Sequence, residues 1–229
     1  MATSIAFFDL DKTLINRNSA TLWIRFELAA RRITRWQALQ GLGWVIRYSL
    51  GAADMTDAIR QSVVTLRGQR EDEMRRRADA FYDEMLRGLY RPGAFDAIER
   101  HRRSGERLVL LTSSSNYVSE RVCADLGLDG HLSNRFEVDE AGCYTGRAIE
   151  PLCFGDGKVV LARRYAASQG AELADCSFYT DSHSDLPMLE AVGRPVAVHP
   201  DPRLRRLARR RRWPTVDWDT AISTAEDDR

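Results

Sequence analysis

The chain has 229 residues, of which 44% are hydrophobic and 29% charged, a composition typical of a globular protein that can bury a sizeable core. The formal net charge of +1 argues against general binding of nucleic acid or of an anionic membrane surface. No apolar run reaches the ~18 residues of a membrane span. The four cysteines lack metal-ligand spacing and no leader sequence is recognisable, so we expect reduced thiols in a cytoplasmic protein.

The first predicted element is a buried strand at residues 5–8, a short apolar run that is partly aromatic and β-branched. Asp9 and Asp11 follow it closely. Two carboxylates at the end of a strand repel each other unless a cation or a shared proton joins them. They could also have a purely structural role, with Asp9 capping a helix and Asp11 in its first turn. This stretch alone leaves both interpretations open.

Residues 17–88 show helical periodicity only, and breaks at the Arg31-Arg32 pair, near Gly51 and at Gly68 divide them into four predicted helices, the last of which ends at Gly88. An all-helical block directly after one strand indicates a helical domain inserted into an α/β domain. We therefore predict an α/β core of residues 1–16 and 89–229, and a helical cap of residues 17–88. Hinges for opening and closing this cap are expected near 16–19 and 88–93.

Strands and helices alternate from Pro92 onward, which is typical of a parallel sheet with right-handed crossovers. A β-hairpin is predicted within residues 134–149, with Gly142 at its turn. The tail from residue 220 is polar and is expected to lack regular structure. The remaining strands are predicted at residues 107–111, 177–180, 195–198 and 215–216.

Polar residues lie at or beside the ends of these strands: Thr112, Asp181, Asp185 and, at a helix start, Lys158. Each has an ordinary explanation, since hydroxyl and acid side chains often cap helices and a lysine is usually solvated. The carboxyl ends of parallel strands meet at one edge, however, and that edge is where open α/β sheets bind ligands. Lysine is also rare here, because the sequence has only Lys12 and Lys158.

This collection of side chains suits phosphoryl transfer. Asp9, Asp181 and Asp185 can hold a hard divalent cation, and Mg²⁺ is the expected one because it also binds phosphate. Lys158 can neutralise the nucleophile and the phosphoryl oxygens. Thr112 can donate its hydroxyl to a phosphoryl oxygen, together with amides of the helix that follows.

The two acids after the first strand would then have different tasks. Asp9 can attack phosphorus in line and form an aspartyl-phosphate. Asp11 can protonate the leaving oxygen and later activate water. Hydrolysis of a phosphate monoester is among the slowest uncatalysed reactions, so a metal, a nucleophile and an acid/base are all needed.

These stretches resemble, in their order along the chain, the four motifs of the haloacid dehalogenase-like (HAD) superfamily. The matching stretches are Asp9-Leu-Asp-Lys-Thr13, Leu110-Leu-Thr112, Lys158 and Asp181-Ser-His-Ser-Asp185. The helical insertion after the first motif resembles the phosphoserine-phosphatase-like branch, HAD-IB, with its four-helix cap. Asp185-Leu-Pro-Met-Leu and Val198-His-Pro-Asp-Pro are similar to stretches of the same branch.

The resemblance implies a Rossmann-like, doubly wound parallel sheet with an inserted four-helix cap, Mg²⁺ as cofactor and a small phosphate ester as substrate. It implies that Asp9 is the nucleophile and that Asp11 is the acid/base, which favours ester hydrolysis because relatives without the second acid catalyse other reactions. The implied phosphate ligands are Thr112, Ser113 and Lys158. The implied metal ligands are Asp9, Asp11, Asp181 and Asp185.

Two departures from phosphoserine phosphatases argue against phosphoserine as the substrate. Those enzymes carry a glutamate shortly after the first motif that binds the substrate ammonium, and Asn18 takes its place here. Their second motif continues with glycines, whereas Thr112 is followed by three serines. Arg60 is our candidate for contacting a substrate carboxylate, as an arginine of this region does in relatives. Arg25 and Arg47 are alternatives, although cap arginines are usually solvated.

The predicted cap is rich in aromatic residues, which can be explained in two ways. They can fill the core of a small helical domain, or they can line an apolar pocket for the leaving group, even for a lipid-like phosphate. The residues are Trp23, Phe26, Trp36, Trp44, Tyr48, Phe81 and Tyr82.

Other functions are less consistent with the sequence. A phosphotransferase would use the same aspartyl-phosphate but pass the phosphoryl group to an alcohol. A phosphoacceptor domain of the response-regulator type also uses acids, a hydroxyl and a lysine, but it phosphorylates an acid on a later strand and has no cap. The basic run 203–212 invites a nucleic-acid role, yet Leu204, Leu207 and Ala208 predict an amphipathic helix with a solvated arginine face.

Overall fold

The computed structural model describes the backbone of residues 4–49 and 55–220, and the side chains of 4–44 and 56–220. In these residues seven strands form one sheet in the order β4-β3-β2-β1-β5-β6-β7. All neighbours are parallel except β3 and β4, which form an antiparallel hairpin. The strands are β1 Ile5–Phe8, β2 Arg107–Ser115, β3 Gly130–Val138, β4 Tyr144–Ile149, β5 Ser177–Thr180, β6 Arg194–Val198 and β7 Thr215–Val216.

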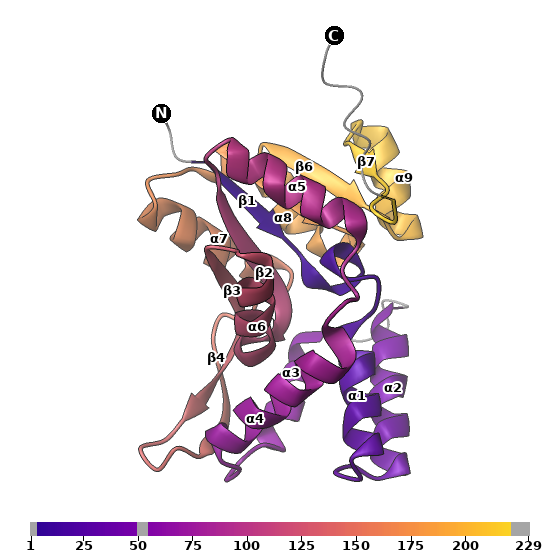
Figure 1. Cartoon of the computed structure of the whole chain (residues 1–229), viewed down its shortest axis with the longest axis vertical. Helices are drawn as coiled ribbons and strands as arrows, with labels where there is room; N and C mark the ends of the chain where they lie inside the picture. Colours follow the sequence, from indigo (N-terminus) through magenta and orange to yellow (C-terminus); the bar gives the residue numbers. More distant parts are fainter. Residues whose placement is uncertain (1–3, 50–54, 221–229) are drawn as a thin grey trace.

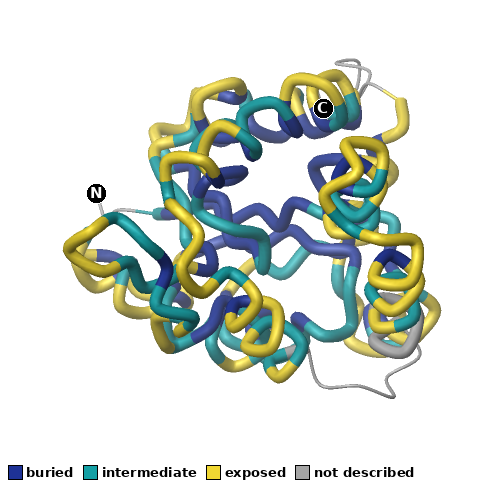
Figure 2. The backbone as a smooth tube through the Cα atoms, turned by 90° about the horizontal axis from the view of Figure 1, so that it is seen from below, coloured by how far each residue is buried: buried dark blue, intermediate teal, exposed yellow. Residues whose placement is uncertain are grey.

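Helices cover both faces of the sheet, as in a Rossmann-like doubly wound fold (Figures 1 and 2). The alternation of β1 shows the two layers, because Ala6 and Phe8 pack on one side and Ile5 and Phe7 on the other. One face packs against α5 Pro92–Arg103 and α6 Asn116–Leu126. The other packs against α7 Asp156–Ser168, α8 Leu186–Ala191 and α9 Pro202–Arg211. The predicted α/β fold class is therefore confirmed.

The described part of the chain between β1 and α5 holds four α-helices, which we call the cap helices and which lie in the lower half of Figure 1. They are α1 Ser19–Ala29, α2 Arg35–Ser49, α3 Met55–Val64 and α4 Glu71–Phe81, and a single π-helical turn, Tyr82–Leu86, continues α4. The two chain crossings into this region lie side by side, since Ile15 bridges Tyr90 and the Asn16 amide donates to the Leu89 carbonyl at 3.1 Å.

The cap helices have a third attachment that the sequence did not indicate. The turn between α3 and α4 joins the β3–β4 hairpin through backbone hydrogen bonds of 2.9 Å, from the Gly68 amide to the Tyr144 carbonyl and from the Tyr144 amide to the Gln69 carbonyl. Phe26 and Phe81 also belong to the same hydrophobic cluster as residues of α5 and α6. The division of the chain into core and cap, and the hinges, remain predictions.

Three sequence predictions need correction. β2 continues to Ser115 rather than ending at residue 111, because Ser115 still pairs with Asn134 of β3. The predicted hairpin starts before residue 134, since β3 begins at Gly130, where it pairs in parallel with β2 of the main sheet. Trp36 was expected in the cap core or on an apolar pocket but is 66% exposed, as is Leu39 of the same helix at 60%, because α2 packs mainly against α1.

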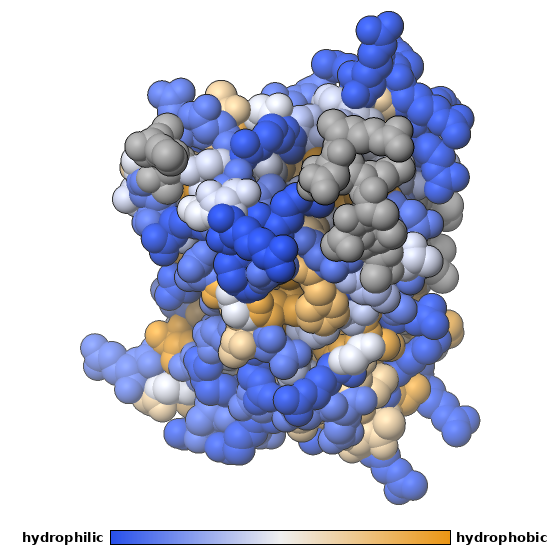
Figure 3. Space-filling model, turned by 45° about the horizontal axis from the view of Figure 1, so that its top comes forward, coloured by the Kyte–Doolittle hydropathy of each residue, from blue (hydrophilic) through white to orange (hydrophobic). Residues whose placement is uncertain are grey.

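The surface agrees with a solvated role for most of the arginines. In α9, Leu204 and Ala208 are buried while the arginines around them are exposed, as predicted for the basic run. Figure 3 shows a largely hydrophilic face with hydrophobic residues gathered in a middle band.

The four cysteines, all within the described residues, are free thiols. No helix among the described residues could cross a bilayer. The predicted unstructured tail beyond residue 220 lies outside the described residues.

Candidate active site

The loop after β1 carries both acids of the first motif. Residues Leu10–Leu14 form one wide helical turn in which Lys12 has a left-handed backbone, with φ of 57°. Several hydrogen bonds hold this turn. The Lys12 amide donates to the Arg17 carbonyl at 3.0 Å and the Ile15 amide to the Leu10 carbonyl at 3.0 Å, and the buried Arg91 guanidinium donates to the Lys12 carbonyl at 3.2 Å. The turn brings Asp9 and Asp11 to the same cavity.

Lys158 joins two of the predicted acids. Its ammonium donates to Oδ1 of Asp9 at 2.8 Å and to Oδ2 of Asp185 at 2.9 Å, and its side chain is only 2% exposed. Thr180, the last residue of β5, donates its hydroxyl to the same oxygen of Asp185 at 2.7 Å. Residues from the ends of β1 and β5 and from the first turn of α7 therefore meet, as the sequence predicted.

Thr13 has a bridging position that sequence reasoning missed. Its hydroxyl faces Oδ2 of Asp9 at 3.5 Å and accepts the backbone N–H of Asp181 at 3.0 Å, so it ties the ends of β1 and β5 together. The residue is completely buried. This threonine is part of the first motif, and its position there was the feature of the sequence that could have indicated a role in the site.

The second strand brings its hydroxyls to the same cavity. Thr112 is buried, and its Oγ1 accepts the Ser114 amide at 3.2 Å. Ser113 donates its hydroxyl to the Cys153 carbonyl at 2.9 Å. Because β2 continues to Ser115, helix α6 begins only at Asn116, so the amides nearest Thr112 belong to the strand rather than to a helix start.

The acids have perturbed acidities because the cluster is buried. Burial raises the pKa of Asp9 to about 7, although Lys158 opposes the shift. Burial also raises the pKa of Asp11, and it raises that of Asp181 well above its ordinary value. Burial alone would lower the pKa of Lys158, but Asp185 and Asp9 outweigh it and raise the pKa, so the ammonium stays charged. One ammonium group, that of Lys158, thus balances the two carboxylates of Asp9 and Asp185 only in part.

The donor set fits a hard divalent cation. Asp181 is 8% exposed, and the described residues offer its carboxylate no hydrogen bond or ion pair. A buried carboxylate without a partner is costly unless a cation accompanies it. Asp9, Asp181 and Asp185, with the carbonyl of Asp11, provide the all-oxygen ligands that Mg²⁺ prefers.

A second group, His199, Asp217 and Asp219, could also be considered for a metal. Its carboxylates are exposed, and Asp219 already pairs with Arg91, so we assign no metal to this group.

A cavity of about 500 Å³ lies between these acids and the cap helices. All the predicted catalytic, phosphate-binding and metal-binding residues of the core line it: Asp9, Asp11, Thr112, Ser113, Lys158, Asp181 and Asp185. The predicted aromatic residues separate into groups. Trp23, Trp44 and Phe81 line the cavity, Phe26 and Tyr82 are buried in the hydrophobic core, and Trp36 is exposed. The side chain of Tyr48 lies outside the described residues. Both explanations of the aromatic residues therefore apply, and Phe81 fits both because it is also buried in the hydrophobic core.

The predicted specificity residues have other partners. Asn18 lines the cavity, but its Oδ1 caps α1 by accepting the amide and hydroxyl of Thr21 at 2.9 and 3.1 Å. Arg60 is half exposed, does not line the cavity and pairs with Glu150 at 3.0 Å. Its position gives no support to a role in binding a substrate carboxylate. Of the two alternative arginines, Arg25 is exposed and does not line the cavity, and the side chain of Arg47 lies outside the described residues.

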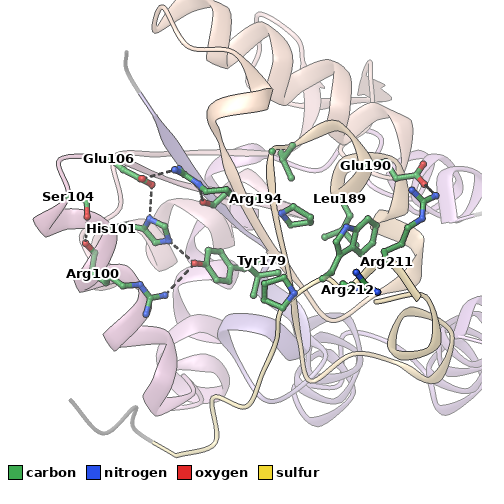
Figure 4. Close-up of a pocket in the computed structure, with 17 residues that line it drawn as sticks. Arg100, His101, Ser104, Glu106, Tyr179, Leu189, Glu190, Arg194, Arg211 and Arg212 are labelled. Atoms are coloured by element: carbon green, nitrogen blue, oxygen red, sulfur yellow. Dashed lines mark hydrogen bonds and ion pairs between the residues drawn. The ribbon is translucent and has the colours of Figure 1, made fainter. Parts of the chain in front are cut away.

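A second cavity, of about 780 Å³, lies at the opposite edge of the sheet (Figure 4). It is bordered by Ser177 and Arg194, the first residues of β5 and β6. Within it, His101 contacts Glu106 at 2.6 Å and the Tyr179 hydroxyl at 2.7 Å. It contains none of the predicted site residues, and open α/β sheets bind ligands at the carboxyl ends of their strands. The smaller cavity is therefore the candidate active site.

Comparison with known proteins agrees with this assignment. The family model for haloacid dehalogenase-like hydrolases matches residues 6–190. Phosphoserine phosphatase SerB1 of Mycobacterium tuberculosis is 31% identical over 228 residues, covering 97% of this chain and 73% of the relative. A histidinol-phosphatase of Neisseria meningitidis is 26% identical over 219 residues, covering 94% and 99%. A Bordetella pertussis protein of unknown function has a solved structure with a TM-score of 0.86 and 29% identity, covering 95% and 100%.

The match to the family model includes the first three motifs and the last acid pair, from Asp9 to Asp185. The relatives span almost the whole chain and are phosphatases by name. The chain therefore belongs to the haloacid dehalogenase-like hydrolase family, as a phosphatase of its phosphoserine-phosphatase-like branch.

Proposed function

We propose that this phosphatase is a Mg²⁺-dependent hydrolase of a small phosphate monoester that works through an aspartyl-phosphate on Asp9, with Asp11 as general acid and base. The observation that carries the proposal is the position of Lys158, whose ammonium joins Asp9 to Asp185 beside Asp11 at the base of one cavity. A nucleophile, a cation and an acid that act on one phosphoryl group would have to lie this close together, and this closeness supports the proposal.

In the first step a carboxylate oxygen of Asp9 forms a bond to phosphorus while the bond from phosphorus to the ester oxygen breaks. Asp11 gives its proton to that departing oxygen, which leaves as an alcohol. Burial supports this role, because the raised pKa of Asp11 keeps the proton available nearer to neutral pH. Lys158 and Thr112 are placed to stabilise the charge on the phosphoryl oxygens.

In the second step water attacks phosphorus, Asp11 takes a proton from that water, and the bond to Asp9 breaks. The products are inorganic phosphate and the free carboxylate. Bound at Asp9, Asp181, Asp185 and the Asp11 carbonyl, Mg²⁺ would neutralise phosphate charge and allow the anionic nucleophile to approach. The chain's own residues orient the acids for both steps through Thr13, Thr180 and Ser19.

The test is hydrolysis of p-nitrophenyl phosphate with and without Mg²⁺, in the wild type and in Asp9→Asn. We expect turnover that requires the metal and falls by at least about 10⁴-fold in the variant. Rapid acid quench followed by mass spectrometry should find a phosphoryl group on the peptide that contains Asp9. Product analysis with an added alcohol separates hydrolysis from transfer. Full turnover in Asp9→Asn would contradict the proposed nucleophile.

A further inference from the structure

The candidate active-site cavity has a charged floor and an uncharged roof. From this division we propose that the substrate is the phosphate monoester of an uncharged, largely apolar alcohol. The inference rests on the proposed function and concerns only the leaving group. It sets the chain apart from relatives named for phosphoserine and histidinol, whose alcohols carry charged groups at neutral pH.

The charges of the cavity all come from one side. Its charged lining residues lie in the loop after β1, in the first turn of α7 and after β5. The side formed by the described cap residues has none, and we call this side the roof. Seven large apolar residues dominate the roof: Trp23, Ile24, Trp44, Ile59, Leu66, Met74 and Phe81. A leaving group bound against them loses its water without gaining a counter-charge.

The nearby cap charges are engaged away from the cavity. The most buried of them, Glu27, pairs with Arg32 at 3.2 Å and with Arg77. Arg60 pairs with Glu150, and Arg67 donates to the Thr145 carbonyl at 3.0 Å. None of these residues lines the cavity. The ammonium and carboxylate of a substrate such as phosphoserine would therefore be desolvated against the roof without partners.

Asn18 is one of four polar residues that line the cavity from this side, together with Ser19, Ser62 and Thr65, and the Ser19 hydroxyl is already engaged by Asp11. Because Oδ1 of Asn18 already accepts two hydrogen bonds from Thr21, the side chain presents its NH₂ group as a donor. A donor can bind a neutral oxygen but cannot bind an ammonium. An alcohol with an ether or hydroxyl oxygen near the phosphate and an apolar remainder would match both Asn18 and the roof. The cavity, at about 500 Å³, has the size of an ordinary small-molecule site.

The experiment compares kcat/KM of the full chain with Mg²⁺ for alkyl phosphates of similar intrinsic reactivity. The esters are O-phospho-L-serine, 2-phenylethyl phosphate and octyl phosphate, and p-nitrophenyl phosphate tests activity as such. We expect the better of the two apolar esters to exceed phosphoserine by about 100-fold, mainly through a lower KM. The two apolar esters distinguish an aromatic from an alkyl leaving group, and preference for either one supports the proposal.

Phosphoserine turned over as well as the apolar esters would overturn the inference while leaving the proposed function intact. No hydrolysis of any ester, including p-nitrophenyl phosphate, would instead overturn the proposed function and the inference with it. The two failures are therefore distinguishable.

A matched pair of variants tests the roof itself. Trp44 and Trp36 lie on the same helix, but Trp44 lines the cavity and Trp36 is 66% exposed away from it. Trp44→Ala should raise KM for the preferred apolar ester by about tenfold with little change for phosphoserine, and Trp36→Ala should change neither. Equal effects of the two substitutions would contradict a binding role for the roof. Because Trp44 is 37% exposed, its removal is compatible with folding, which thermal unfolding can check.

Discussion

The carboxylate of Asp11 accepts two hydrogen bonds from Ser19, one from its backbone N–H at 2.7 Å and one from its hydroxyl at 3.0 Å. Asp11 belongs to the loop after β1, and Ser19 is the first residue of α1. The proposed general acid is thus oriented by the first turn of the cap helices. Any movement of α1 relative to the sheet would move the partner of the catalytic acid.

Removing the Ser19 hydroxyl should therefore affect chemistry more than binding. We expect Ser19→Ala to lower kcat by about tenfold, the effect of a lost charge-assisted hydrogen bond, with little change in KM. Ser19→Thr keeps the hydroxyl and should recover most of the rate. Thr21→Val changes a hydroxyl in the same helix turn that bonds Asn18 instead, and serves as the control. A rise in KM with unchanged kcat would contradict a role in orienting Asp11.

Replacing Lys158 should disable the site without loss of the fold's architecture. Lys158→Met removes the cation between Asp9 and Asp185 and should reduce kcat/KM by about 10²- to 10³-fold, because a phosphoryl group loses an electrostatic partner. Lys158→Arg keeps the charge but needs more room than a side chain that is 2% exposed has available. We therefore expect it to recover little activity in the same kinetic assay. Wild-type rates in Lys158→Arg would show that charge alone is sufficient.

Magnesium should stabilise the folded protein as well as activate it. Chelation is expected to abolish activity, and Mg²⁺ at 100 times its Kd should add about 2.7 kcal/mol to the free energy of unfolding. Asp181→Asn should remove most of that stabilisation, because Asp181 is the acid without a protein partner. Asp217→Asn, in the exposed His199 group, is the matched control and should leave the Mg²⁺ effect unchanged. Calorimetry with and without Mg²⁺ measures this stabilisation in both variants. Equal stabilisation by Mg²⁺ in the two variants would show that the metal binds elsewhere.

His101 should make stability depend on pH. Burial lowers its pKa below the ordinary value of 6.5, although Glu106 opposes this, and the nearby guanidinium groups of Arg100 and Arg194 lower it further. At a pH between 6.5 and the lower pKa of His101 in the folded protein, the unfolded chain binds a proton that the folded protein does not. The free energy of unfolding therefore decreases as the pH falls through that window, by at most about 1.4 kcal/mol per pH unit. The protein loses no stability through this group above pH 6.5.

The measurement is urea unfolding of the wild type and of His101→Gln between pH 7.5 and 5. The variant has no group that titrates at this position, so its stability should fall less steeply with acid. The Tyr179 hydroxyl, which contacts the same imidazole, does not ionise in this range. Parallel curves for the two proteins would show that His101 titrates equally in both states.

The sequence by itself determined the architecture, the family and the residues that meet in the candidate active site. Short apolar runs must be buried, and the polar residues after them must lie at the strand ends, so the sequence alone predicts Asp9, Thr112 and Asp181 on one edge of the sheet. The order of the motifs identified the family. These features are local, because each depends on a few consecutive residues.

Only the tertiary structure decided which partners those residues and the cap residues have. Arg60 lies 90 positions from Glu150 in the sequence, and Thr13 lies 168 from Asp181, so no periodicity could reveal either contact. Periodicity predicted an apolar face of α2 but not that Trp36 would face solvent while Trp44 faced the cavity. A helix's pattern shows which side chains share a face, whereas the neighbour that covers the face depends on packing between distant segments. The place of the candidate active site at the strand ends was therefore predictable from sequence, and which cap residues line its cavity was not.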